Sequence, residues 1–533
     1  MAKVKINQGT LLGGMCETDS GYEYIEFLQI PYAKPPLGNL RFQVPQPPDH
    51  WEGIRDATTV DETHVSYQEY QVAIGPNKRG SEDCLYLNVF KPRLPPSDSK
   101  PLPVMVYIHG GGFSIGTGII KAEGGPDFLI ERGVVIVSIN YRVGVFGFLS
   151  LDIPEAAGNM GLKDQVMALQ WVQNNISEFA GDKNNVTVLG VSAGSASIEY
   201  LILSPLSKGL FHKAILQSGS ALNQWAFSTD IKELSVKLAI ELGFNGSPDD
   251  SRAIYDFLLR QPTETIGHIS YFKVPNINDT KRIYFGFGPS IEKDFGNGHE
   301  FLTDYPYNIL KEGRFNKVVS IRGYCESEGL LSMGMKPDLV QELREKKNYT
   351  DFWSYPLSIN EKNEYNAKFK QIYQNEEDEE QGVVDFFGDY DFTSGNWIAS
   401  KLIAAAGVPV YAYCFSYEGN YNLVSKRLFK ISKGGVCHGD DIGYMLKVSI
   451  YAENIETSDQ DIIMRNRMVT MWTNFAKHGN PTPITSELLP LQWPRFTNDK
   501  LEYLKIDKEL QVLSNYRPDG MALFEEIYDK HRK

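Results

Sequence analysis

The sequence is most tightly constrained at residues 190–194, which read GVSAG. A β-branched apolar run at residues 185–189 precedes this motif, and residues 193–203 have the composition of a helix that stops before Pro205. A serine in such a strand-turn-helix elbow has small neighbours and an exposed hydroxyl above a parallel sheet. The segment therefore predicts an α/β architecture with a nucleophilic serine at Ser192.

A second G-x-S-x-G pattern at residues 112–116 offers Ser114 as an alternative nucleophile. It also follows a predicted strand, at residues 104–109, but the chain continues into the glycine-rich residues 116–118 and not into a helix. The elbow geometry requires a helix directly after the serine. We therefore expect Ser114 to belong to a loop and Ser192 to be the nucleophile.

The loop that contains Ser114 begins with HGGGF at residues 109–113. Glycine amides in such a loop can donate hydrogen bonds to the oxyanion of a tetrahedral intermediate. The helix that starts after Ser192 also directs its positive end toward the same oxygen. We expect the amides of Gly111, Gly112 and Ala193 to form the oxyanion hole.

A serine nucleophile needs a base, and the chain contains nine histidines. In this fold the triad follows the chain order serine, acid, histidine. His438 satisfies that order and lies in the glycine-flanked segment GGVCHGDD at residues 434–441. The neighbouring Cys437 could act as a thiol nucleophile, but the complete serine elbow favours a packed loop cysteine. The sequence therefore favours His438 as the general base.

The acid is expected between Ser192 and His438, in a loop after a strand. Residues 318–322 form such an apolar strand, and the loop after it contains Glu326 and Glu328. Either carboxylate could orient the imidazole and stabilise its cationic form. Spacing alone does not separate the two.

Several longer motifs resemble those of the type-B carboxylesterase and cholinesterase family. They are EDCLYLNVFKP at residues 82–92, FAGDKNNVTVLGVSAG at 179–194, IPYA at 30–33, NYR at 140–142, GLKDQ at 161–165 and LQSGS at 216–220. The resemblance covers the whole chain and is greatest to the intracellular insect α-esterases. It implies an α/β-hydrolase fold: one domain over residues 1–533, with a mostly parallel central sheet flanked by helices and an active-site gorge formed by large insertions.

The resemblance also assigns individual residues. The family's catalytic acid precedes a glycine in an S-x-E-G segment, which corresponds here to Glu328. Trp225 matches the tryptophan that walls the acyl pocket, and Tyr284 and Phe285 fall where the family places residues that limit acyl size. An apolar pocket of this kind implies uncharged alkyl or aryl esters as substrates.

Three features depart from particular family members. Val191 precedes the nucleophile where the family usually carries Glu, which leaves the balance of acylation and deacylation open. Residues 58–79 contain no tryptophan, whereas cholinesterases place there the aromatic ring that binds quaternary ammonium. Juvenile hormone esterases share the GxxHxxD pattern at residues 435–441 but typically have Gln at position 191. Choline esters are thus disfavoured, and a juvenile-hormone-specific enzyme is a weaker alternative.

Charge and composition restrict the partners. The net charge is −14 and basic clusters are missing, which argues against nucleic acid and against anionic membranes. Asn140 and Arg142 interrupt the longest hydrophobic region, residues 133–151, so no membrane span is predicted. An acidic surface is compatible with a monomer or a homodimer, and the serine chemistry needs no cofactor.

The start of the chain and the cysteine count favour a cytoplasmic protein. The first residues lead directly into a predicted strand without an apolar signal segment. Five cysteines are an odd number, and only Cys16 precedes Cys84, so the partner that secreted relatives use to close a loop onto Cys84 is missing. Reduced thiols are the expected state.

The sequence thus predicts a carboxylic ester hydrolase that works through Ser192, His438 and Glu328 and an acyl-enzyme, with a role in detoxification or ester degradation. Organophosphates and carbamates are expected to react at the same serine. Two alternatives remain: a slow-turnover scavenger that sequesters reactive esters or insecticides, and a juvenile-hormone-esterase-like enzyme.

Overall fold

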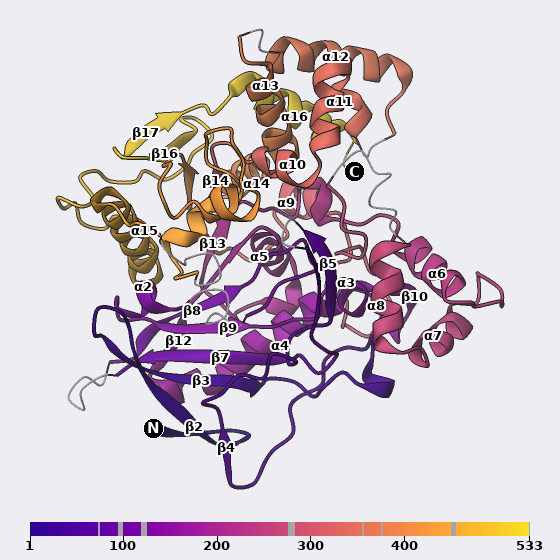
Figure 1. The fold of residues 1–533 in the computed structure, drawn as a ribbon, viewed down its shortest axis with the longest axis vertical. Coiled ribbons are helices and arrows are strands. Elements are labelled where there is room, and N and C mark those ends of the chain that lie inside the picture. Colours follow the sequence, from indigo (N-terminus) through magenta and orange to yellow (C-terminus); the bar gives the residue numbers. More distant parts are fainter. Residues whose placement is uncertain are drawn as a thin grey trace.

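The computed structural model describes most of the chain. The described ranges are residues 1–72, 75–93, 100–118, 125–274, 283–353, 356–374, 377–448 and 455–531. Within them, the central feature is a 13-stranded sheet with the order β1-β2-β3-β7-β9-β8-β12-β13-β14-β15-β16-β17, and β4 pairs with β2 outside this path. Figure 1 shows this sheet running through the middle of the molecule.

The sheet is parallel in its centre and antiparallel along its two ends, apart from β4, which pairs parallel to β2. The pairs from β9 through β8, β12, β13, β14 and β15 to β16 are all parallel. The outer strands are β1 (Ala2–Ile6), β2 (Gly9–Glu17), β3 (Glu23–Pro31), β4 (Ile54–Asp56), β7 (Tyr86–Pro92) and β17 (Gln511–Ser514). The inner strands are β9 (Val135–Ile139), β8 (Leu102–Ile108), β12 (Gly181–Val191), β13 (Lys213–Gln217), β14 (Val319–Cys325), β15 (Val410–Phe415) and β16 (Glu502–Ile506). The predicted mostly parallel sheet is therefore present.

Helices cover both faces of the sheet because the inner strands are apolar on both sides. On β8, Val104 and Val106 pack into one buried cluster and Met105 into the other. The first face carries α4 (Met160–Asn175), α5 (Ala193–Leu203) and α14 (Ser394–Ala405); the second carries α2 (Asp127–Ile130) and α15 (Asp459–His478). Helices thus cover both faces of the sheet, and a site can form at the carboxyl ends of its strands.

The elements around the elbow agree with the sequence in type but differ in their limits. The strand expected at residues 185–189 is longer, because β12 pairs with β8 from Gly181 onward. The helix expected over residues 162–179 ends at Asn175 and tightens into a 3-10 turn, Ile176–Phe179, which Ala180 closes in the left-handed conformation. Helix α5 covers residues 193–203 as predicted.

Long insertions form the periphery seen in Figure 1. On one side lie α3 (Gly144–Phe148), β10 (Ser150–Ile153), β11 (Ala156–Ala157), α6 (Ile231–Glu241), α7 (Ser251–Leu259) and α8 (Thr263–Phe272), with the hairpin β5 (Gln68–Val72) and β6 (Gly75–Arg79). At the other end lie α9 (Pro306–Lys311), α10 (Leu330–Met335), α11 (Pro337–Lys346), α12 (Ile359–Tyr373), α13 (Glu379–Gly388) and α16 (Pro518–His531). Across the described ranges, no helix has both the length and the apolar character needed to cross a bilayer.

Candidate active site

Ser192 occupies a strained turn between β12 and α5. Its φ and ψ are 59° and −125°, a combination that a non-glycine residue adopts only when the surrounding structure enforces it. The backbone N–H of Ser192 donates to the carbonyl oxygen of Gln217 at 2.8 Å, which ties the elbow to the end of β13. The turn leaves Ser192 at the N-terminal end of α5, where the helix dipole favours negative charge.

The small residues of the elbow are required by contacts with β8 and the loop after it. A Cβ atom on Gly194 would lie 2.1 Å from the carbonyl oxygen of Ile108. A Cβ atom on Gly110 would lie 2.7 Å from the carbonyl oxygen of Val191 and 3.1 Å from Cβ of Ser192. The glycine loop predicted to hold the oxyanion therefore packs directly on the Ser192 elbow.

The glycine loop has a conformation that side chains would prevent. Gly111 and Gly112 have φ values of 107° and 60°, and a Cβ atom on Gly112 would lie 2.5 Å from the ring of Phe285. Ser114, the alternative nucleophile, is buried in this loop, and its hydroxyl lies 3.3 Å from the carbonyl oxygens of both Gly112 and Phe285, to which it donates. The structure thus places Ser114 in the loop, where it holds Phe285 against the glycines.

His109 anchors the start of the glycine loop as a neutral ring. It is buried and stacks on Tyr141, with ring centroids 4.4 Å apart, and its Nδ1 lies 2.8 Å from the carbonyl oxygen of Gly110. Burial lowers the pKa of His109 to about 4, because the charged imidazolium would lose its hydration. His109 therefore stays neutral at physiological pH.

The structure brings His438 and Glu328 into contact. His438 Nδ1 lies 2.7 Å from Oε2 of Glu328, and both side chains are buried. The other Glu328 oxygen accepts the backbone N–H of Cys325 at 2.8 Å. Glu326, which the sequence left as an alternative, forms an ion pair with Lys505 at 3.1 Å. Since Nδ1 faces Glu328, Nε2 is the imidazole nitrogen left for another partner.

The loop that carries His438 is fixed by Asp440. One oxygen of Asp440 accepts the backbone N–H of Val424 at 2.9 Å, and the other accepts that of Cys437 at 2.8 Å. The backbone N–H of Ser327 also donates to the carbonyl oxygen of Val436 at 3.0 Å, which joins the loop of the acid to that of the histidine. Cys437 itself is buried, and burial raises the pKa of its thiol well above the usual range, so it is a poor nucleophile.

Aromatic side chains connect the glycine loop to the histidine. The ring of Trp225, in the 3-10 turn η4 (Gln224–Ala226), lies 6.2 Å from Phe285, 6.3 Å from Phe113 and 5.7 Å from Phe392. The indole N–H donates to the backbone carbonyl of Asp391 at 2.8 Å. Since its only polar atom is satisfied, Trp225 offers an apolar surface beside the glycine loop.

Phe392 is a site residue that the sequence reasoning missed. Its ring lies 4.2 Å from the imidazole of His438, at 31°. It is carried by a π-helical turn, η6 (Asp389–Thr393), between α13 and α14. Such turns are frequent at functional sites, but an insertion of this kind has no local sequence signal strong enough to identify it.

Tyr284 is placed differently from its neighbour Phe285. The Tyr284 hydroxyl donates to both carboxylate oxygens of Asp230, at 2.9 and 3.1 Å. Asp230 precedes α6, so the polar end of Tyr284 is held at the start of that helix. Phe285 instead faces Gly112 and Trp225.

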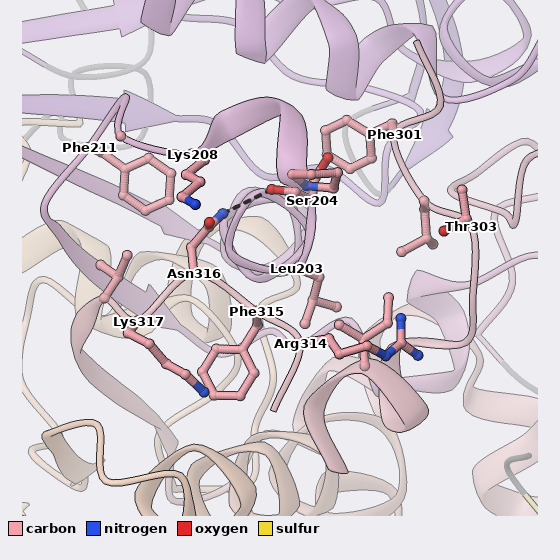
Figure 2. A pocket seen from close by; sticks show the side chains of 15 residues that line it. Leu203, Ser204, Lys208, Phe211, Phe301, Thr303, Arg314, Phe315, Asn316 and Lys317 are labelled. Carbon is pink, nitrogen blue, oxygen red and sulfur yellow. Dashed lines mark hydrogen bonds between the residues drawn. The ribbon is translucent and has the colours of Figure 1, made fainter. Parts of the chain in front are cut away.

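A separate cavity of about 730 Å³ lies at the far end of α5 (Figure 2). It is lined by the apolar side chains of Leu203, Phe211 and Phe315, and Asn316 donates across it to the carbonyl oxygen of Ser204 at 2.9 Å. Since α5 has eleven residues, this cavity is one helix length, roughly 16 Å, from Ser192. It is distinct from the cluster around Ser192 and His438.

In the described part of the chain, no group of three or more acidic, histidine or cysteine side chains is arranged to hold a metal ion.

Known proteins of one family match this chain over nearly its full length. The carboxylesterase family model matches residues 1–524. Juvenile hormone esterase of Tribolium castaneum is 33% identical, over 97% of this chain and 90% of its own. Esterase FE4 of Myzus persicae is 34% identical over 91% and 86%, and carboxylesterase 1F of Mus musculus is 32% identical over 93% and 88%.

The parallel sheet, the serine elbow and the order of the loops define an α/β-hydrolase. The chain belongs to the carboxylesterase family. It is accordingly a carboxylic ester hydrolase.

Replacement of Gly194 by Ala should abolish most ester hydrolysis. The added methyl would lie 2.1 Å from the carbonyl oxygen of Ile108, so α5 must move away from β8 and displace Ser192. A displacement of about 1 Å costs on the order of 100-fold in rate. Gly14→Ala is the matched control, because its nearest neighbour would lie at an ordinary 3.5 Å. Equal kcat/KM values for the two variants would contradict this account of the elbow.

The depressed pKa of His109 predicts a specific loss of stability in acid. The ordinary value is 6.5 and the folded value about 4, so the stabilisation is complete above pH 6.5 and is lost as the pH falls from 6.5 toward 4. Between pH 7 and pH 5 this loss should be about 2 kcal/mol. Urea denaturation of wild type and His109→Gln at both pH values measures it. The wild type should lose more stability than the variant, and equal losses would show that His109 does not titrate as described.

Proposed function

We propose that Ser192, His438 and Glu328 form a catalytic triad that hydrolyses uncharged, apolar carboxylic esters through an acyl-enzyme. The observation that carries this proposal is the 2.7 Å contact between His438 Nδ1 and Glu328, in loops that follow β15 and β14 at the same sheet edge as the Ser192 elbow. Parallel strands bring their carboxyl ends to one edge.

Each residue has one role in the reaction. His438 Nε2 accepts the Ser192 proton as Oγ attacks the ester carbonyl, while Glu328 holds the imidazole and stabilises its cationic form. The amides of Gly111, Gly112 and Ala193 donate to the oxyanion. The tetrahedral intermediate breaks its bond to the alkoxide, which leaves as the alcohol with the proton from His438. Water, deprotonated by His438, then attacks the acyl-enzyme, and the acid leaves as Ser192 regains its proton.

The acyl group is assigned to the aromatic wall of Trp225, Phe285 and Phe392. Trp225 and Phe392 are buried, with 5% and 2% of their surface exposed, and the Trp225 N–H is already bonded to backbone. Such a wall favours alkyl or aryl acyl chains through burial of apolar surface. Tyr284, the other residue that the resemblance places at the acyl pocket, has its hydroxyl held by Asp230 at the start of α6.

The proposed physiological role is detoxification or ester degradation in a reducing compartment such as the cytoplasm. Organophosphates and carbamates would react at the same activated hydroxyl, because both present an electrophilic centre with a leaving group. All five cysteines lie in described ranges and none of them forms a disulfide there, which supports a compartment that keeps thiols reduced. The active form is proposed to be a monomer or a homodimer.

A second candidate is a scavenger whose serine is acylated or phosphorylated rapidly and releases the acyl or phosphoryl group slowly. Val191 supports it, because this side chain supplies no base next to Ser192 where the family usually carries Glu. A third candidate is hydrolysis of a juvenile hormone ester, supported by relatives named juvenile hormone esterase. Val191 weighs against that third candidate, because those enzymes typically have Gln at this position.

Stopped-flow hydrolysis of a chromogenic butyrate ester separates the first two candidates. We expect rapid steady turnover in wild type and a loss on the order of 10⁴-fold or more in Ser192→Ala. A burst of about one equivalent followed by slow release would instead identify the scavenger. Undiminished turnover in Ser192→Ala would overturn the triad.

Replacement of Trp225 by Ala should widen the acyl specificity. Removal of the indole leaves space beside Phe285, so kcat/KM for a branched or aryl acyl ester should rise about tenfold relative to the butyrate ester. Trp51→Ala is the matched control. The Trp51 indole N–H also donates to a backbone carbonyl, that of Thr10 at 3.1 Å, but this indole lies beside β2. An acyl profile that is the same in both variants would exclude Trp225 from the acyl pocket.

A further inference from the structure

We propose that Gln217 is a positioning residue that couples the Ser192 elbow to the His438 loop through Asp441. This inference rests on the triad proposed above and adds a residue that does not touch the substrate. Gln217 and Asp441 are both fully buried, and they come from segments separated by 224 positions.

The first half of the coupling is a backbone contact. Gln217 is the last residue of β13 and lies opposite Val191 in the parallel register with β12. Its carbonyl oxygen accepts the Ser192 N–H at 2.8 Å. The strained conformation of Ser192 is therefore held directly by the backbone of Gln217.

The second half is made by the side chain of the same residue. Gln217 Nε2 donates to Oδ2 of Asp441 at 2.7 Å, and Trp472 Nε1 donates to Gln217 Oε1 at 3.3 Å. These two partners fix the amide orientation, because one is only an acceptor and the other only a donor. Asp441 is three residues after His438, in the 3-10 turn η8 (Asp440–Tyr444), so its position determines where the His438 loop ends.

Tyr413 completes the arrangement from the neighbouring strand. Its hydroxyl donates to the same Asp441 oxygen at 2.9 Å, and its ring packs edge-on against Trp472 with centroids 5.3 Å apart. The ring also fills the space beside Gly323 on β14, where a Cβ atom would lie 2.2 Å away. Side chains from β13 and β15 thus donate to one carboxylate of η8, and Trp472 of α15 contacts both of these donors.

This carboxylate is difficult to explain as a stabilising feature. Its second oxygen, Oδ1, is buried without a hydrogen-bond partner among the described residues. Burial raises the pKa of Asp441 to about 6, the donors Gln217 and Tyr413 oppose that rise, and the Glu328 carboxylate adds to it. A buried and incompletely bonded carboxylate costs folding free energy. A role in placing the His438 loop accounts for its presence.

The test reverses the donor and acceptor of the Gln217 and Asp441 pair. Gln217→Glu places two carboxylates face to face, and kcat should fall about 100-fold while KM changes less than about threefold, because the defect is one of alignment. When Gln217→Glu is combined with Asp441→Asn, the amide introduced at position 441 can donate to the carboxylate introduced at position 217. The second N–H of the same amide can donate to the Tyr413 hydroxyl oxygen, which lies against the same Asp441 atom as Gln217, so this double variant should recover to within about tenfold of wild type.

Rates are expressed per reactive serine, counted by titration with a phosphonate ester. Gln29→Glu is the matched control, because Gln29 is also buried and makes two amide contacts, to the backbone of Asp61 at 2.6 and 2.7 Å, on β3. It should keep the wild-type kcat. If Gln217→Glu does not fold, Gln217→Met removes the same contacts without a second charge and should lower kcat about tenfold at unchanged KM.

Wild-type kcat per reactive serine in either Gln217 variant would overturn the inference, as would a double variant no better than Gln217→Glu. Ser192→Ala separates this failure from failure of the triad. An inactive Ser192→Ala beside a fully active Gln217→Glu rejects only the coupling. An active Ser192→Ala rejects the triad and the coupling with it.

Discussion

The close approach of α5 to β8 is the constraint on which the rest of the site depends. Gly194 lies against the carbonyl of Ile108 with no room for a side chain, and Gly110 lies similarly close to the carbonyl of Val191. These contacts force the chain to turn within one residue, which gives Ser192 its strained conformation. The same contacts bring the glycine loop onto the elbow, so one packing requirement positions both the proposed nucleophile and the proposed oxyanion donors.

The second organising feature is that the proposed base and the proposed acyl wall are held by the same turn of the chain. The π-helical turn η6 presents Phe392 to the imidazole of His438 and the carbonyl of Asp391 to the indole of Trp225. A change in this turn therefore alters the proposed base and the proposed acyl wall together. Gln217 also makes two such contacts, with its backbone bonded to the elbow and its side chain bonded to Asp441 in the loop after His438.

The sequence predicted those parts of the fold that local chemistry determines. The α5 helix is fixed by an elbow motif and a terminal proline, and both signals lie within a few residues of it. The choice between Glu326 and Glu328 needed either family resemblance or the contact with His438, since both lie in one loop. Spacing carries no information on which side chain of a loop turns inward. Phe392 and Gln217 were out of reach because their contacts depend on an extra residue in a helical turn and on segments 224 positions apart. Such long-range contacts are set by the sheet order and by the loops that the strands place side by side.

The central claim, that Ser192 is the residue acylated during ester hydrolysis, is tested most directly by trapping the acyl-enzyme. A rapid acid quench during hydrolysis of a slowly released carbamate ester, followed by proteolysis and peptide mass spectrometry, locates the covalent adduct. The account predicts one adduct per chain, on the peptide that contains Ser192, and no adduct in His438→Ala on the same time scale. An adduct on Ser114 or Cys437 would contradict it.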